Sequence, residues 1–422
     1  MKILICCDFY YPSVGGVQIV LQQIAERLAK RGHHITVATS KLIERKSTSI
    51  NGINIKEFNV SGNFIGGLKG DVQKYRKYVL SEDYDVLLMK AAQSWTFDAL
   101  MDNLDKIKKR KVFIPCGFSG LYYPYYKEYF KKMPEALRQF NHLIFYADDY
   151  RDINFAREHN IDSFSVIPNG ASETEFSVKP DSSFRDRFGI GKNEILVLTV
   201  GTFTGGKGHF ETASAFQLAK LDKPATLILN GNLPDKKTKL TKIRLVKEYL
   251  KMGPLSMLKR IYSNLLSLTG IKKVKKKRDW NDVAKEVNSN ESDKNIIITN
   301  LKREDLIQCF LNSNLFVFAS NVEYSPLVLY ESTAAGLPFL SVPAGNATEI
   351  VEWTQGGLIC PAPSDKNGRT TVDPQVLADK ISSLLKNKVL LKKLGEDGRK
   401  NWEKKFTWDH ISLEYEKVLE GQ

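Results

Sequence analysis

The chain alternates short apolar runs with amphipathic helical stretches, and it goes through this series twice. Such alternation is typical of parallel β-strands joined by helices. The first series has apolar runs at 2–7, 35–38, 86–89, 112–114, 142–145 and 165–167. The second series has them at 194–200, 225–229, 295–299, 315–318 and 338–342. This pattern predicts an α/β fold made of two Rossmann-like, doubly wound parallel-sheet domains that face a cleft.

A length of 422 residues also suits two domains. The turn-forming residues of Ile167–Gly170 mark a linker between the two series. We therefore place an N-terminal Rossmann-like domain at 1–175 and a C-terminal one at 176–374. Residues 375–422 are expected to form helices that pack back across both domains. Four bulky side chains would anchor these helices: Trp402, Phe406, Trp408 and Tyr415.

The strongest functional signal lies between residues 321 and 338. Ser325 is a good N-cap and Pro326 suits the first helical position, so a helix is expected to begin there. Gly336 is expected to end it. The unpaired N–H groups from about Leu327 onward, together with the positive end of the helix dipole, predict a site for a phosphate group.

Two glutamates flank this helix start. Glu323 follows the apolar run 315–318, so it is expected at the carboxyl end of a strand, where open α/β sheets bind ligands. Glu331 lies eight residues further on, about 12 Å away if the whole span were helical. The two carboxylates are therefore expected to contact different parts of one extended ligand. Two solvated surface glutamates are the alternative interpretation.

Metal and disulfide chemistry have little support in the sequence. The five cysteines are odd in number and scattered, without the spacing of a disulfide framework or a zinc site. Asp148, Asp149 and Asp152 are explained as acids at a helix start, where the dipole favours them. No apolar run approaches the ~18 residues of a membrane-spanning helix, and Asp8 cuts the opening run short. We expect a cytoplasmic protein without a bound metal.

The excess positive charge is concentrated in one segment. The net charge of the chain is +14, and 236–278 alone contains fifteen Lys or Arg and the single Glu248. Apolar residues at helical spacing within 235–290 predict a basic helical insertion. Two interpretations stay open: helices packed on the protein's own surface, or peripheral docking on an anionic membrane surface. Nucleic acid is disfavoured, because the segment has almost no aromatic residues for base stacking.

Six short motifs, in this order, resemble those of the large family of retaining nucleotide-sugar glycosyltransferases with the GT-B fold, known as family 4. They are Pro12–Gly16, Arg31–Val37, Ile167–Gly170, Val200–Gly208, Glu323–Glu331 and Ala344–Ile350. Each motif is weak alone, but their order and spacing together are specific. The resemblance implies transfer of a sugar from a nucleotide-diphosphate-sugar donor to a saccharide or lipid-linked acceptor, with retention of configuration. The products would be polysaccharide, lipopolysaccharide or glycolipid.

The resemblance also implies a role for each matching residue. Lys207 would stabilise charge on the departing nucleotide and Glu323 would contact the transferred sugar, which makes them the catalytic candidates. Glu331 would accept hydrogen bonds from the ribose. The other donor-binding candidates are Gly15, Gly16, Gly201, Thr202, Gly231, Ser325, Pro326 and Leu327. No cofactor is implied, because Lys207 and the helix start supply the positive field that a metal would otherwise provide.

Two departures from the family pattern keep other functions open. Thr202 stands where many members have an arginine, and residues 114–119 lack the histidine that the family often has there. A catalytically weak scaffold or binding protein with the same fold is therefore one alternative, and a nucleotide-sugar epimerase or a phosphorylase is another. The tyrosine-rich stretch 122–126 is expected to face the acceptor, because tyrosine rings stack on sugar faces; burial in the core is the alternative for some of these tyrosines.

Overall fold

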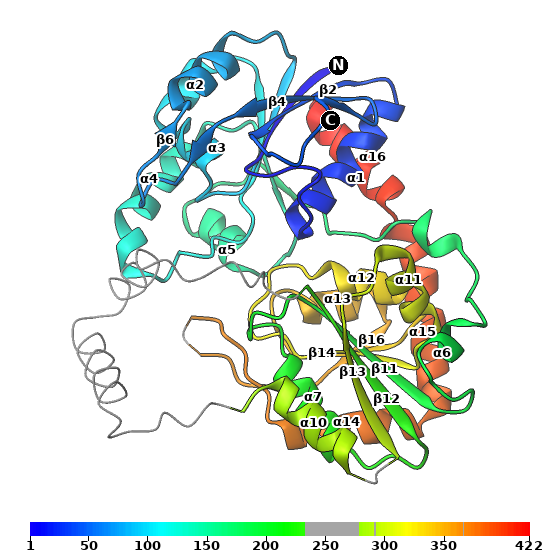
Figure 1. The fold of residues 1–422 in the computed structure, drawn as a ribbon. Coiled ribbons are helices and arrows are strands. Elements are labelled where there is room, and N and C mark those ends of the chain that lie inside the picture. Colours follow the sequence, from blue (N-terminus) through cyan, green and yellow to red (C-terminus); the bar gives the residue numbers. More distant parts are fainter. Residues whose placement is uncertain (233–277, 291–292, 366) are drawn as a thin grey trace.

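The structure is a computed structural model that describes residues 1–232, 278–290, 293–365 and 367–422 (Figure 1). Most of the basic insertion expected at 235–290 lies outside the described residues. The helices and the membrane contact predicted from 236–278 lie outside the described residues, apart from Arg278. Across the described residues, no helix is both long and apolar enough to cross a membrane.

The first sheet forms the core of what we call the N-terminal lobe, the upper half of Figure 1. Its strands run in the order β10-β9-β8-β7-β1-β2-β4-β3, and all neighbours are parallel except β3 and β4. The strands are β1 (Lys2–Cys6), β2 (His34–Ser40), β3 (Ser49–Ile50), β4 (Ile53–Phe58), β7 (Val86–Lys90), β8 (Arg110–Ile114), β9 (His142–Phe145) and β10 (Phe164–Val166). A separate small antiparallel pair consists of β5 (Val60–Ser61) and β6 (Lys69–Gly70).

Helices cover this sheet because one side of each helix is apolar. In α1 (Gly16–Lys30) the buried residues recur at helical spacing: Val20, Leu21, Ile24, Ala25 and Leu28. They pack in one core cluster with Ile3 and Ile5 of β1. The other helices of the lobe are α2 (Val72–Ser81), α3 (Trp95–Asp98), α4 (Lys127–Arg138) and α5 (Arg151–Glu158), with 3-10 turns at Met101–Lys106 and Pro124–Tyr126.

The second sheet forms the C-terminal lobe, and all its neighbouring strands are parallel. The order is β13-β12-β11-β14-β15-β16. The strands are β11 (Ile195–Val200), β12 (Ala225–Asn230), β13 (Lys294–Thr299), β14 (Leu315–Phe318), β15 (Phe339–Ser341) and β16 (Gly357–Ile359). The helices are α6 (Phe184–Arg187), α7 (His209–Leu218), α10 (Trp280–Ser289), α11 (Arg303–Asn312), α12 (Leu327–Ala334), α13 (Ala347–Thr354), α14 (Pro374–Lys386) and α15 (Lys388–Lys405).

The last helix, α16 (Trp408–Glu420), crosses back to the N-terminal lobe, where Figure 1 shows it in red beside α1. Trp408 and Tyr415 are buried in the same core cluster as α1, whereas Trp402 and Phe406 are buried in a cluster of the C-terminal lobe. The crossing is fixed by the linker, because Ala171 N–H donates to the Phe406 carbonyl at 3.0 Å. The predicted fold class, two doubly wound sheets with helices crossing back, is confirmed, and the ends of the predicted strands lie within two residues of those observed.

Candidate functional site

The strand order of each sheet decides which loops can meet between the lobes. In the first sheet β1 lies between β7 and β2, and in the second β11 lies between β12 and β14. The chain therefore reverses its direction of winding beside β1 and beside β11, and such switch points open a crevice at the carboxyl ends of the strands. The loops after β1, β11 and β14 contain most of the candidate residues.

The loops after β11 and β14 lie against each other because these two strands pair, with Val197 opposite Leu315. Asn321 N–H donates to the Gly206 carbonyl at 3.0 Å. A Cβ on Gly208, whose φ is +73°, would lie 2.0 Å from the Ala319 carbonyl oxygen, so only glycine fits there.

This contact brings together the two catalytic candidates. Lys207 Nζ lies 2.6 Å from Glu323 Oε1, and the Ser320 hydroxyl donates to the same oxygen at 2.8 Å. The Glu323 side chain keeps 11% of its surface exposed and that of Lys207 keeps 32%. Both groups therefore reach solvent while being held in place. Ser320 was not predicted, and its position directly after an apolar strand is the signal that would have found it.

The helix expected after Glu323 is α12, and its start differs from the prediction by one residue. Pro326, with φ −72° and ψ 115°, is itself the N-cap, and the Ser325 side chain makes no capping hydrogen bond. The prediction of Ser325 as N-cap is wrong, because the chain is still extended at Pro326. The predicted end is confirmed: Gly336 adopts φ +66° and its N–H donates to the Thr333 carbonyl.

The start of α1 faces the start of α12 across the cleft. Gly15 is the N-cap of α1, and Gly16 is its first residue. A Cβ on Gly16 would lie 3.9 Å from Leu327 Cδ1, the first residue of α12. The first N–H groups of a helix have no partner within it, so two sets of free donors and two positive dipole ends converge here.

The remaining glycine candidates shape the loop that carries Lys207. A Cβ on Gly231 would lie 1.8 Å from the Gly201 carbonyl oxygen, and one on Gly201 would lie 2.9 Å from Lys207 Cβ. These close approaches require glycine at both positions. Thr202, between Gly201 and the buried Phe203, is exposed.

Glu331 is held by an arginine that sequence reasoning missed. Arg303, the first residue of α11, lies 2.6 Å from Glu331 Oε1 and donates to both carboxylate oxygens of Glu175 at 2.8 and 2.7 Å. Burial alone would lower the pKa of the Arg303 guanidinium, but the Glu331 and Glu175 carboxylates outweigh burial and the pKa is raised. Glu331 is thus separate from Glu323 and is bound to a different cation. The signal for Arg303 is its position just after β13, at the same edge of the sheet as β12 and β11.

A pocket of about 730 Å³ lies beside Glu323 and is lined by both lobes. From the N-terminal lobe come Tyr123, Tyr125 and Tyr126, so part of the predicted tyrosine stretch does face this cavity. Four non-glycine residues of the same lobe have positive φ and follow β7 or β8: Ala91, Gln93, Cys116 and Phe118. Such backbone strain clusters at functional sites.

Asp152 lies under this pocket and does more than begin a helix. It is fully buried, and the Gly117 N–H donates to its carboxylate at 2.7 Å. Burial raises its pKa to about 6. Asp148 and Asp149 use their backbone N–H groups, which donate to the Glu349 carboxylate at 3.0 and 2.8 Å. These acids therefore belong to a contact between the lobes, a role that the helix-start interpretation did not include.

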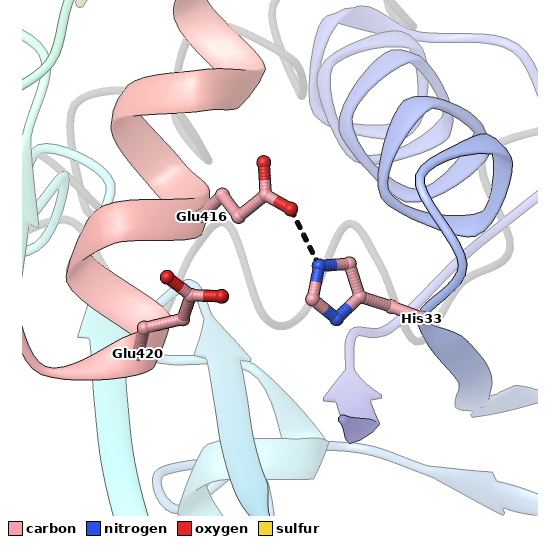
Figure 2. A group of neighbouring side chains, drawn as sticks. All are labelled: His33, Glu416 and Glu420. Atoms are coloured by element: carbon pink, nitrogen blue, oxygen red, sulfur yellow. Dashed lines mark hydrogen bonds and ion pairs between the residues drawn. The ribbon is translucent and has the colours of Figure 1, made fainter.

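Among the described residues, His33, Glu416 and Glu420 form the one group whose ligand atoms are close enough to hold a metal ion (Figure 2). His33 Nε2 lies 2.6 Å from Glu416 Oε1, and Nδ1 lies 3.2 Å from the terminal ammonium of Met1. The Glu416 carboxylate is therefore already bound to the His33 ring. His33 precedes β2, at the amino edge of the sheet and away from the cleft. The group fastens α16 to the N-terminal lobe.

Comparison with known proteins shows which family and which folds this chain resembles. Residues 279–401 match the family described as "Glycosyl transferases group 1". The chain is 22% identical to N-acetyl-alpha-D-glucosaminyl L-malate synthase of Bacillus anthracis, over 99% of this chain and 96% of that protein. Sucrose-phosphate synthase of Thermosynechococcus elongatus superimposes with a TM-score of 0.71 at 17% identity, covering 99% of this chain and 98% of the other. Anabaena HepE in complex with UDP-glucose superimposes with a TM-score of 0.64 at 16% identity, over 100% of both chains.

The chain is a glycosyltransferase with the GT-B fold. The matched family region of this glycosyltransferase contains Glu323, the start of α12 and Glu331. Lys207 and the α1 loop at Gly15 and Gly16 lie outside that region.

Proposed function

We propose that this glycosyltransferase takes its sugar from a nucleotide-diphosphate donor and transfers it to a saccharide or lipid-linked acceptor with retention of configuration. The observation that carries the proposal is the meeting of two helix N-termini, Lys207 and Glu323 between the lobes. A diphosphate is the ligand that such an arrangement of N–H donors and positive charge suits best. Anabaena HepE, which has a similar fold, forms a crystalline complex with UDP-glucose, and this supports a donor of the same class.

The proposed chemistry places negative charge where the positive groups converge. When the bond between the sugar C1 and the phosphate oxygen breaks, its electron pair leaves with the nucleotide diphosphate. The N–H groups at Gly16 and Leu327 and the Lys207 ammonium would stabilise that charge, and a preorganised donor is worth roughly 3 kcal/mol at such a position. The Glu323 carboxylate would favour the positive charge that develops at C1. The acceptor hydroxyl then bonds to C1, and its proton goes to the departing phosphate oxygen.

Glu331 is proposed to accept hydrogen bonds from the ribose hydroxyls. Its Oε1 is bound by Arg303, but a carboxylate has about four acceptor positions, so Oε2 can still serve a ligand. Arg303 would fix the orientation of the carboxylate and neutralise part of its charge. No cofactor is required in this scheme, because the positive field comes from the protein's own groups.

The acceptor is proposed to occupy the pocket beside Glu323. Tyr123, Tyr125 and Tyr126 offer ring faces for a saccharide, and Arg151 and Arg369 offer hydrogen-bond donors at its rim. For a lipid-linked acceptor, the positive charge of 236–278 would favour docking on an anionic membrane surface from the cytoplasmic side. Liposome pelleting of the chain with and without residues 234–279 tests this part, and equal pelleting at low salt would contradict it.

The donor proposal is tested with a panel of nucleotide sugars. Binding of the correct donor raises the melting temperature by mass action, and slow hydrolysis of that donor reports turnover. Glu323→Gln is expected to reduce hydrolysis about 100-fold while nucleotide affinity stays within about three-fold. The exposed Glu352→Gln is the matched control and should behave as wild type.

Two outcomes would contradict the proposal. If no nucleotide sugar raises the melting temperature, the donor class is wrong. If wild type binds a donor but turns over no faster than Glu323→Gln, the chain is a binding protein with this fold, which is the alternative that Thr202 and the missing histidine keep open.

A further inference from the structure

Within the described residues, Glu323 is the one proposed catalytic group whose main chain is also bound by the opposite lobe. Its carboxylate is held from its own lobe by Lys207 and Ser320. Its backbone carbonyl accepts a hydrogen bond at 2.6 Å from the hydroxyl of Tyr150, which belongs to the N-terminal lobe. The position of the carboxylate therefore depends on both lobes.

The next residue, Tyr324, extends into the N-terminal lobe. Its ring packs against Tyr146 and Tyr150, with centroids 5.5 and 4.7 Å away. Its hydroxyl accepts the Tyr146 N–H at 2.9 Å and hydrogen-bonds the buried Asp152 carboxyl. A Cβ on Gly117, at φ +88°, would lie 3.0 Å from the Tyr324 ring, so the seat for this ring requires glycine.

Residues 146–150, which we call the β9 loop, receive further contacts from the C-terminal lobe. The side chain of Asn346 donates to the Tyr146 carbonyl at 2.9 Å, while its backbone N–H donates to the Tyr324 carbonyl at 2.8 Å. Glu349 accepts two backbone N–H groups of the same loop. The β9 loop is thus bound directly to the Glu323 carbonyl, and Asn346 links it to the Tyr324 carbonyl.

We infer that Tyr324 is a positioning residue: by docking on the β9 loop it couples the contact between the two lobes to the position of the Glu323 carboxylate. The inference rests on the proposed function for the role of Glu323, but the coupling itself is a property of the fold. Tyr324 acts through Glu323 and does not need to touch the transferred sugar. Without the docking, Glu323 would keep its contacts with Lys207 and Ser320, but the Tyr150 ring would lose the neighbour that helps to hold its hydroxyl against the Glu323 carbonyl.

The test uses Tyr324→Phe, which removes only the hydroxyl, and Tyr324→Ala, which removes the ring. Tyr84→Phe is the matched control, because the Tyr84 hydroxyl also makes one backbone hydrogen bond, to Val79 at 2.8 Å, within the N-terminal lobe. Hydrogen exchange is measured on peptides that cover 143–152 and 319–331. Tyr324→Phe should speed exchange in both segments by about ten-fold, Tyr324→Ala by more, and Tyr84→Phe in neither.

The kinetic test is hydrolysis of the donor found in the panel. Tyr324→Phe should lower kcat about ten-fold with the KM for donor within about three-fold, because donor binding groups are untouched while the reacting geometry is loosened. Unchanged exchange at 143–152, or unchanged kcat, overturns the inference. A parallel fall in kcat, donor affinity and melting temperature also overturns it, since that is the result of a merely structural role. If wild type turns over no donor, the proposed function fails, and the exchange result still decides whether the coupling exists.

Discussion

Replacing Arg303 with methionine tests a partly buried charge network that the sequence did not reveal. The change keeps most of the aliphatic stem and removes the guanidinium, which leaves the carboxylates of Glu331 and Glu175 without their shared partner. Removing one member of a buried pair costs about 3–5 kcal/mol, whereas exposed pairs contribute about 1 kcal/mol or less. The side chains of Arg303, Glu175 and Glu331 are 36%, 31% and 9% exposed, so the network lies between these limits. We expect a loss of about 2–3 kcal/mol.

A loss of that size lowers the melting temperature of a domain as long as the C-terminal lobe by about 5–10 °C. Thermal unfolding followed by tryptophan fluorescence measures it. Arg187→Met is the control, because Arg187 also joins two acids, Asp181 and Asp305, but is 44% exposed. The control should shift by no more than about 3 °C. If Arg303→Met melts no lower than Arg187→Met, the reasoning about burial is refuted. Arg303→Lys should fall between the two, because lysine keeps the charge but not the planar fork.

Two further predictions concern the loop that carries Lys207. His209 packs beside Phe203, with ring centroids 4.4 Å apart, and burial lowers its pKa to about 4. The stability contributed by neutral His209 is therefore present above pH 6.5 and lost as pH falls toward 4. The wild type should lose about 2 kcal/mol of unfolding free energy between pH 7 and pH 5 that His209→Phe does not lose. Urea unfolding at both pH values measures this, and equal losses in the two proteins would contradict it. Gly231→Ala should weaken nucleotide binding at least ~10-fold, because its Cβ would displace the Gly201 carbonyl. Gly206→Ala is the control and should bind as wild type, because its Cβ would have its nearest neighbour at 4.0 Å. A thermal-shift assay with nucleotide distinguishes the two variants, and equal binding would show that the loop tolerates the displacement.

Much of the fold could be predicted from the sequence because its signals are local. The buried residues of α1 recur at helical spacing, as expected for an amphipathic stretch, and β9 and β14 begin and end where the apolar runs do. The end of α12 was also predicted, because Gly336 has a conformation that glycine favours. Its beginning was not, because the choice between Ser325 and Pro326 as N-cap depends on the path of the loop before it.

The candidate site was only partly predictable. The spacing of two glutamates around a helix start, together with the family resemblance, pointed to Glu323, Glu331 and Lys207. Nothing local indicated that Arg303 would hold Glu331 or that Tyr324 would dock on the opposite lobe. An arginine at a helix start and a tyrosine in a loop are common in any sequence, and only the partners of Arg303 and Tyr324 give them a role.

The sequence by itself determined the alternation of strands and helices, the end of α12 at Gly336 and the chemical types available at the cleft, because these depend on residues a few positions apart. The tertiary structure decided which of those groups meet. Lys207 and Glu323 are 116 positions apart and touch because β11 pairs with β14. Tyr324 and Tyr146 are 178 apart and touch because two sheets face each other at their carboxyl edges. Such contacts follow from strand order and lobe packing, which no local spacing of residues encodes.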